Sequence, residues 1–235
     1  MAMIEIRHSA RRLLCTLASS VFFGSVAFRA VALASLPSTQ AHIIICKETP
    51  IYRTRPNEME CALLAHKQIQ SLPREPIVWR LETFANATDA RRAEGRASVF
   101  VRSGARNWLL TLGTKGQRTP GGTFVTEIGP IFIPRALHYA IVVGEAYSRP
   151  GATTRVHTHP GPEAWYLLAG AQCLEVPGGA LRAGAGQSSF AAANRPMKLT
   201  VVGTANRDAL FFVIGDAALP WTEGSNWRPT ERCKA

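Results

Sequence analysis

The chain has 235 residues, of which 46% are hydrophobic and 18% are charged, with 19 Gly and 15 Pro. This composition can fill a core, which excludes a disordered chain, and the length suits one domain with an N-terminal extension. The formal net charge is +11. Because the basic residues are scattered and form no run with interleaved aromatic residues, we do not expect a nucleic-acid-binding protein.

Residues 1–34 have the pattern of a signal peptide. Three arginines precede an uncharged, mostly apolar run at 13–28, and Ala32–Ala34 supplies a small-x-small cleavage sequence. The apolar run is shorter than the roughly 20 residues of a membrane-spanning helix. We therefore expect a periplasmic or secreted protein with no stable membrane association after cleavage. Arg11-Arg12 resembles a twin-arginine signal but lacks the usual flanking residues, so general secretory export stays equally open.

Four cysteines follow the expected cleavage site: Cys46, Cys61, Cys173 and Cys233. An even number of cysteines in an exported chain indicates disulfides. Four cysteines allow three pairings, and the sequence alone does not choose among them. We favour Cys46–Cys61 as a local link and Cys173–Cys233 as a tie for the C-terminal tail, with four reduced thiols as the alternative.

The first elements after the signal are mixed. Residues 61–71 predict a short helix or strand, and the alternation in Pro76–Phe84 predicts a strand. Residues 86–96 predict a brief helix, with Asn86 as its N-cap. Ala97–Ser103 and Asn107–Leu112, separated by Gly104-Ala105-Arg106, predict a β-hairpin.

The rest of the chain is predicted to form short strands separated by turns. The expected strands are Phe124–Ile133, Leu137–Tyr147, Thr153–His159, Ala164–Leu168, Ala171–Glu175, Gln187–Phe190, Leu199–Gly203 and Leu210–Ile214. A turn about every eight to twelve residues predicts a mainly β sandwich or small barrel. The polar tail after Pro220 is expected to pack through Trp221 and Trp227.

The segment 151–170, GATTRVHTHPGPEAWYLLAG, contains the strongest functional signal. Alternate residues of a strand share one face, so His157 and His159 point the same way. A Pro-Gly-Pro turn then places Glu163 at the start of the next strand. Two imidazoles and one carboxylate can hold one divalent transition metal and leave coordination positions open. We expect Fe, Mn, Ni, Cu or Zn, with the identity undetermined.

This segment resembles the first motif of the cupin superfamily, G-x5-H-x-H-x3-4-E-x6-G, which is met at every position: Gly151, His157, His159, Glu163 and Gly170. The resemblance implies that the two histidines and the glutamate are metal ligands. It also implies a cupin double-stranded β-helix (jelly-roll) barrel over residues 136–216. Residues 35–135 would then be an N-terminal β/α extension, rich in β structure, or a degenerate cupin half, and 217–235 a C-terminal tail.

The second cupin motif is degenerate. When this motif is aligned with the sequence from Gly186, Met197 takes the position at which the family has a histidine as its fourth ligand. A thioether is a weak ligand for hard divalent ions. Three alternatives follow: three protein ligands with water; a site completed by another histidine, such as His138 or His66; or a metal-free barrel in which Met197 fills the interior.

Strand parity gives three candidate substrate-binding residues in the same cavity: Arg155, Trp165 and Met197. An arginine beside the metal can hold a carboxylate, because its planar fork matches that group. The structural alternatives are an Arg155 that lies in solvent at the barrel mouth and a Trp165 that belongs to the core.

We therefore expect an exported cupin-domain protein that binds a divalent metal and that acts on or binds a small, anionic organic molecule. The resemblance permits a metal-dependent enzyme of the dioxygenase or isomerase type without fixing the reaction. The alternative is a non-catalytic ligand-binding or structural cupin without metal. The resemblance also allows a homodimer. Motifs of other common active sites, such as G-x-S-x-G and H-E-x-x-H, do not occur.

Overall fold

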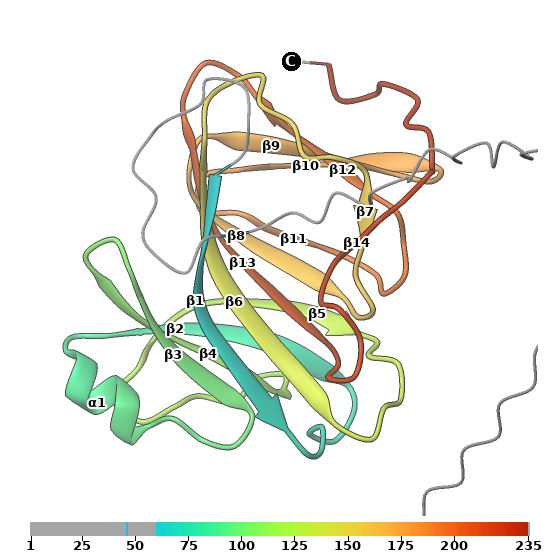
Figure 1. Cartoon of the computed structure of the whole chain (residues 1–235). Helices are drawn as coiled ribbons and strands as arrows, with labels where there is room; N and C mark the ends of the chain where they lie inside the picture. The colour runs from blue at the N-terminus through green and yellow to red at the C-terminus, as the bar shows by residue number, and fades with distance from the viewer. Residues whose placement is uncertain (1–45, 47–59, 235) are drawn as a thin grey trace, which may run out of the picture. The chain divides into compact units, whose positions relative to one another are not determined.

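A computed structural model describes Cys46 and residues 60–234, so the expected signal peptide at 1–34 lies outside the described residues. Within them the chain forms fourteen strands and one short helix (Figure 1). The mainly β class expected from the turn spacing is confirmed. No helix in this part of the chain is long and apolar enough to cross a membrane.

The bounds of these elements are β1 (Glu60–Ile69), β2 (Ile77–Phe84), α1 (Ala87–Arg92), β3 (Ser98–Ser103), β4 (Arg106–Thr114), β5 (Thr123–Ile131), β6 (Tyr139–Ser148), β7 (His157–Thr158), β8 (Glu163–Ala169), β9 (Ala171–Val176), β10 (Gly179–Gly184), β11 (Ser188–Ala191), β12 (Lys198–Val202), β13 (Arg207–Asp216) and β14 (Glu223–Gly224). Asn86 caps α1 as expected, accepting a hydrogen bond from the Asp89 N–H.

Four antiparallel sheets result. Their strand orders are β1-β6-β13-β8-β11, β3-β4-β2-β5, β10-β9-β12 and β14-β7. The segment 60–69, expected to be a helix or a strand, is a strand at the edge of the five-stranded sheet, where it pairs with β6. Strand β10 was not expected, because its sequence GALRAG is rich in residues with low strand propensity.

Strand β13 is buried on both faces, which makes it the centre of the core (Figure 1). Leu210, Phe212 and Ile214 belong to an apolar cluster shared with the four-stranded sheet. Phe212 packs edge-on against Trp79 of β2, with ring centroids 5.0 Å apart. Phe211, on the opposite face, belongs to a second cluster shared with the three-stranded sheet. The five-stranded sheet therefore packs against a different sheet on each side.

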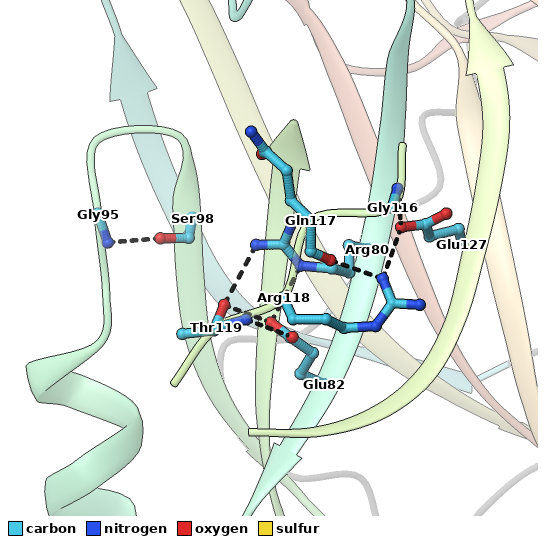
Figure 2. A network of polar contacts seen from close by, with 9 residues as sticks. All are labelled: Arg80, Glu82, Gly95, Ser98, Gly116, Gln117, Arg118, Thr119 and Glu127. Carbon is cyan, nitrogen blue, oxygen red and sulfur yellow. Dashed lines mark hydrogen bonds and ion pairs between the residues drawn. The ribbon is translucent and has the colours of Figure 1, made fainter. Parts of the chain in front are cut away.

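The outer face of β2 carries a buried ion pair that holds the 115–122 loop (Figure 2). Nε of Arg80 lies 3.1 Å from Oε2 of Glu82, and both side chains are almost fully buried. Thr119, from the loop, donates its N–H to Glu82 at 2.8 Å and accepts from Arg80 at 3.1 Å. Its hydroxyl also donates to Glu82. The loop is thus fixed by charges that have no access to solvent.

Glu82→Gln removes the carboxylate charge with little change of shape and leaves Arg80 buried without a charge partner. We expect the free energy of unfolding to fall by about 3 kcal/mol, the usual cost of breaking a buried pair from one side. Urea denaturation measures this free energy of unfolding. Glu127→Gln, which breaks the nearby Arg118–Glu127 pair, is the matched control. Arg118 is 48% exposed, so a loss of about 1 kcal/mol or less is expected. Equal losses in the two variants would contradict this account.

A carboxylate on β9 holds the C-terminal tail. The buried Glu175 accepts hydrogen bonds from the backbone and hydroxyl of Thr230 and from the Arg232 N–H at 3.2 Å. A disulfide joins Cys173, two residues earlier, to Cys233. The second disulfide joins Cys46 to Cys61, so the two bonds are the pairs favoured above. The tail is therefore attached covalently and by a charged acceptor.

Desolvation acts to raise the pKa of Glu175, but the hydrogen bonds from Thr230, Arg232 and Cys233 outweigh it and lower the pKa below its usual value. Because the folded-state pKa is depressed, the stabilisation is complete above the unfolded pKa near 4.5 and is lost as the pH falls through the lower folded value. We expect Glu175→Gln to lower the unfolding free energy by about 1–2 kcal/mol at pH 7. The difference between the two proteins should shrink as the pH falls below 4.5, whereas a difference that stays constant under acid conditions would refute the assignment.

Candidate metal centre

The three motif residues meet at one end of the five-stranded sheet. His157 lies in β7, His159 follows it, and Glu163 is the first residue of β8. Glu163 is paired with Val213 of β13 and Ala191 of β11, so its backbone is held from both sides. All three side chains are buried, with exposed fractions of 5% or less.

Gly161 lets the turn between His159 and Glu163 pack directly on β13. A Cβ atom at this position would lie 1.6 Å from the carbonyl oxygen of Ile214. The Ile214 N–H also donates to the carbonyl of Pro162 at 3.3 Å. No other residue type can fit this approach of two backbones. The turn therefore fixes the distance from the histidines to the carboxylate.

Backbone carbonyls orient both imidazoles. Nδ1 of His157 lies 2.8 Å from the Arg155 carbonyl, and Nδ1 of His159 lies 2.6 Å from the Trp221 carbonyl. Since a carbonyl only accepts hydrogen bonds, both Nδ1 atoms must carry a proton. In the neutral rings, Nε2 then carries a lone pair. This is the tautomer and the outer partner that metal-binding histidines usually have.

The free Nε2 atoms converge on one carboxylate oxygen. Oε2 of Glu163 lies 3.0 Å from Nε2 of His159 and 4.0 Å from Nε2 of His157. The potential ligand atoms of the cluster all lie within 4.8 Å of one another. With neutral rings, His159 Nε2 and Glu163 Oε2 are two buried acceptors without a donor among the described residues. Such a pair needs a cation between its members, either a proton on His159 or a metal ion.

The two histidines differ in their affinity for a proton. Burial lowers the pKa of His157, and the opposing charge of Glu163 does not compensate for it. Burial acts in the same direction on His159, but the charge and hydrogen bond of Glu163 and the Trp221 carbonyl together raise the pKa of His159. A proton in the metal-free site therefore resides on His159.

In the metal-free protein, NMR titration of the imidazole resonances should show His159 titrating above pH 6.5 and His157 below it. Glu163→Gln should lower the pKa of His159, because it removes the charge that offsets burial. His138→Ala, at an exposed position outside the cluster, is the control. A His159 pKa that is unchanged in Glu163→Gln would show that the Glu163 contact does not set it.

The donor set fits a divalent transition metal. Two neutral imidazoles and one carboxylate form a three-ligand arrangement that leaves positions open. Met197, the expected fourth-ligand position, does not join it: its backbone pairs with that of His157, and its buried side chain belongs to the second apolar cluster. His66 and His138 are both exposed and lie outside the cluster of described residues.

A cavity adjoins the three residues. The space inside it that can hold the centre of a water molecule is about 50 Å³, and the cavity is partly open to solvent, so it suits a very small molecule. The walls are mostly apolar and include Trp165, Leu199, Phe211, Trp221 and the Cys46–Cys61 disulfide. Trp165 thus lies where strand parity predicted. Met197 does not line the cavity, contrary to the expectation.

The expectation for Arg155 is corrected by the structure. Arg155 is exposed, and Thr154 lines the cavity in its place. The backbone explains the difference, because Thr154 bonds to Leu199 and His157 bonds to Met197. Three steps along one strand, from 154 to 157, therefore match two steps along its partner, from 199 to 197. The extra residue shifts the alternation by one, as in a β-bulge, and the expected strand at 153–159 is reduced to His157–Thr158.

Two further residues of the site were not predicted. Trp221 accepts the His159 Nδ1 proton through its carbonyl, and its ring stacks on His159 with centroids 5.6 Å apart. The sequence showed it only as a packing residue of the tail. Arg207, the first residue of β13, lines the cavity although it is 1% exposed. A single arginine before an apolar strand gives no periodic signal that would mark it as a site residue.

Comparisons with known proteins give fold-level likenesses only. No family model matches the sequence, and no curated protein matches it. Among solved structures, DMSP lyase DddQ from Ruegeria pomeroyi DSS-3 is 22% identical with a TM-score of 0.33, over 36% of this chain and 43% of that chain. A cupin-like protein from Thermotoga maritima is 19% identical with a TM-score of 0.34, over 36% and 64%. An oxalate oxidase is 15% identical with a TM-score of 0.32, over 36% and 45%.

Each of these matches spans less than two thirds of the solved chain. The description of the fold therefore rests on the sheets of this chain and not on these matches. Its antiparallel sheets, the turn at Gly161 and the buried His-His-Glu cluster agree with what the first motif implies. The described residues form an antiparallel β fold, and its buried His-His-Glu cluster stands at the positions of the first-motif residues His157, His159 and Glu163.

Proposed function

We propose that the protein is an exported cupin-type protein that holds one divalent transition metal on His157, His159 and Glu163 and binds a small organic molecule in the adjoining cavity. The observation that carries the proposal is the buried three-residue cluster, in which the potential ligand atoms of His157, His159 and Glu163 lie within 4.8 Å of one another. Backbone carbonyls occupy both Nδ1 atoms, which leaves both Nε2 atoms for a metal ion.

The chain's own residues would prepare this site in two ways. The carbonyls of Arg155 and Trp221 hold both imidazoles with Nε2 toward Glu163. The aromatic walls, including Trp165 and Trp221, limit the access of water. When bound, the metal would supply a Lewis acid with open coordination positions. A small molecule in the cavity would then lie beside those positions.

A non-catalytic binding protein is the second candidate. Apart from the cluster, Arg207 is the one ionisable side chain among the described residues that line the cavity. An arginine does not act as a general acid or base near neutral pH, because its side chain stays protonated. A reaction in this cavity would therefore depend on the metal and its ligands, whereas ligand binding needs no further group.

Two disulfides support the export part of the proposal. Such bonds form and persist in oxidising compartments such as the periplasm and the extracellular space. The expected signal peptide at 1–34 agrees with this location.

Elemental analysis of the purified protein tests the metal. We expect about one Fe, Mn, Ni, Cu or Zn per chain, and less than a tenth of that in His157→Ala, because two ligands hold such ions weakly. His138→Ala is the matched control and should keep its metal, since His138 is exposed and outside the cluster. Wild-type protein that takes up no metal after anaerobic reloading would refute the proposal and leave a metal-free cupin.

A further inference from the structure

Arg207 is a buried cation that the metal cluster does not use. It begins β13 and shares the face of Ala209 and Phe211, which turns it toward the cavity. Its exposed fraction is 1%, and no carboxylate of the described residues contacts it, although the charges of Glu163 and Asp208 favour its protonated form. A buried charge that contacts no counter-charge is costly.

One side of the guanidinium is fixed and another is free. Nε donates to Oε1 of Gln172 at 2.7 Å, and Gln172 is itself 1% exposed. Gln172 in turn donates to Ser189 at 3.4 Å. These contacts hold the plane of the guanidinium. Nη1 is buried and has no hydrogen-bond acceptor among the described residues. Water or a molecule in the cavity can supply this acceptor.

The charges that line the cavity favour an anion. Burial lowers the pKa of Arg207 to about 10, so the side chain is charged at neutral pH. A divalent metal brings two positive charges and Arg207 brings one, whereas Glu163 offers one negative charge. The described part of the metal-loaded cavity would thus hold two positive charges in excess. A planar carboxylate matches the fork of a guanidinium and offsets part of that charge.

We propose that Arg207 is the anion anchor of the cavity and that the ligand is a small carboxylate with an apolar body. The carboxylate binds Arg207, the body packs against Phe211 and Trp165, and a second polar group binds the metal. The last of these contacts rests on the proposed metal function. Arg155, the residue expected from the sequence to hold an anion, is exposed and outside the cavity.

Calorimetric titration with acetate, as the simplest carboxylate, tests the anchor in zinc-loaded protein. Arg207→Gln should weaken acetate binding at least tenfold, and Arg207→Lys should restore part of it. Arg155→Gln is the matched control and should bind as the wild type does. The metal content of each variant is measured in parallel. If Arg207→Gln keeps one metal per chain and binds acetate as tightly as the wild type, the anchor is refuted and the metal function stands.

A wild type without metal would refute the proposed function instead. The same titrations on the metal-free protein then decide the anchor, with a tenfold loss in Arg207→Gln supporting it and equal affinity overturning it. If the variants do not fold, NMR of the wild type replaces them. Acetate should shift the Nε–H resonance of Arg207 and leave that of Arg80, a buried arginine paired with Glu82, in place. Acetamide, neutral and of similar size, should shift neither, and an unmoved Arg207 signal at high acetate would overturn the proposal.

Discussion

The burial of β13 between two apolar layers is the constraint on which the fold and the site both depend. Residues of one parity, such as Phe212, pack against the four-stranded sheet, and Phe211 of the other parity reaches the cavity. A shift of one residue in register would exchange the two faces of the whole strand. Such a shift would remove Arg207 from the cavity, so the packing of the core also sets the chemistry of the site.

Three side-chain atoms of the site have no hydrogen-bond partner among the described residues: Nε2 of His159, Oε2 of Glu163 and Nη1 of Arg207. Buried polar groups in a purely structural core are almost always paired. Other buried atoms of the described chain, such as Nη1 of Arg80, also lack a partner, so this property alone does not mark a site. What distinguishes the three is that their side chains line one cavity.

Local features of the site could be predicted from the sequence, and long-range ones could not. The H-x-H and glutamate spacing identified the cluster because the residues lie within one hairpin-like segment. The placement of Arg155 failed, since one extra residue between Thr154 and His157 changes the alternation. Trp221 lies 62 residues from the histidine that it orients. A single sequence contains no pattern that joins two such positions.

The difference between local and long-range features also explains which strands could be predicted. Alternating, β-branched or aromatic segments such as β2 were recognised, whereas β10, with two glycines and two alanines among its six residues, looked like a turn. Its place in a sheet depends on pairing with β9 and not on its own propensity. Tertiary pairing thus decided the elements that local sequence left open.

The contribution of Trp221 couples the C-terminal tail to the site. The Trp221 carbonyl holds Nδ1 of His159, and the chain that follows is held on β9 by Glu175 and by the disulfide to Cys173. The orientation of the His159 imidazole therefore depends on the position of a segment far away in the sequence. A change that detaches the tail from β9 would also loosen the side chain that the tail orients.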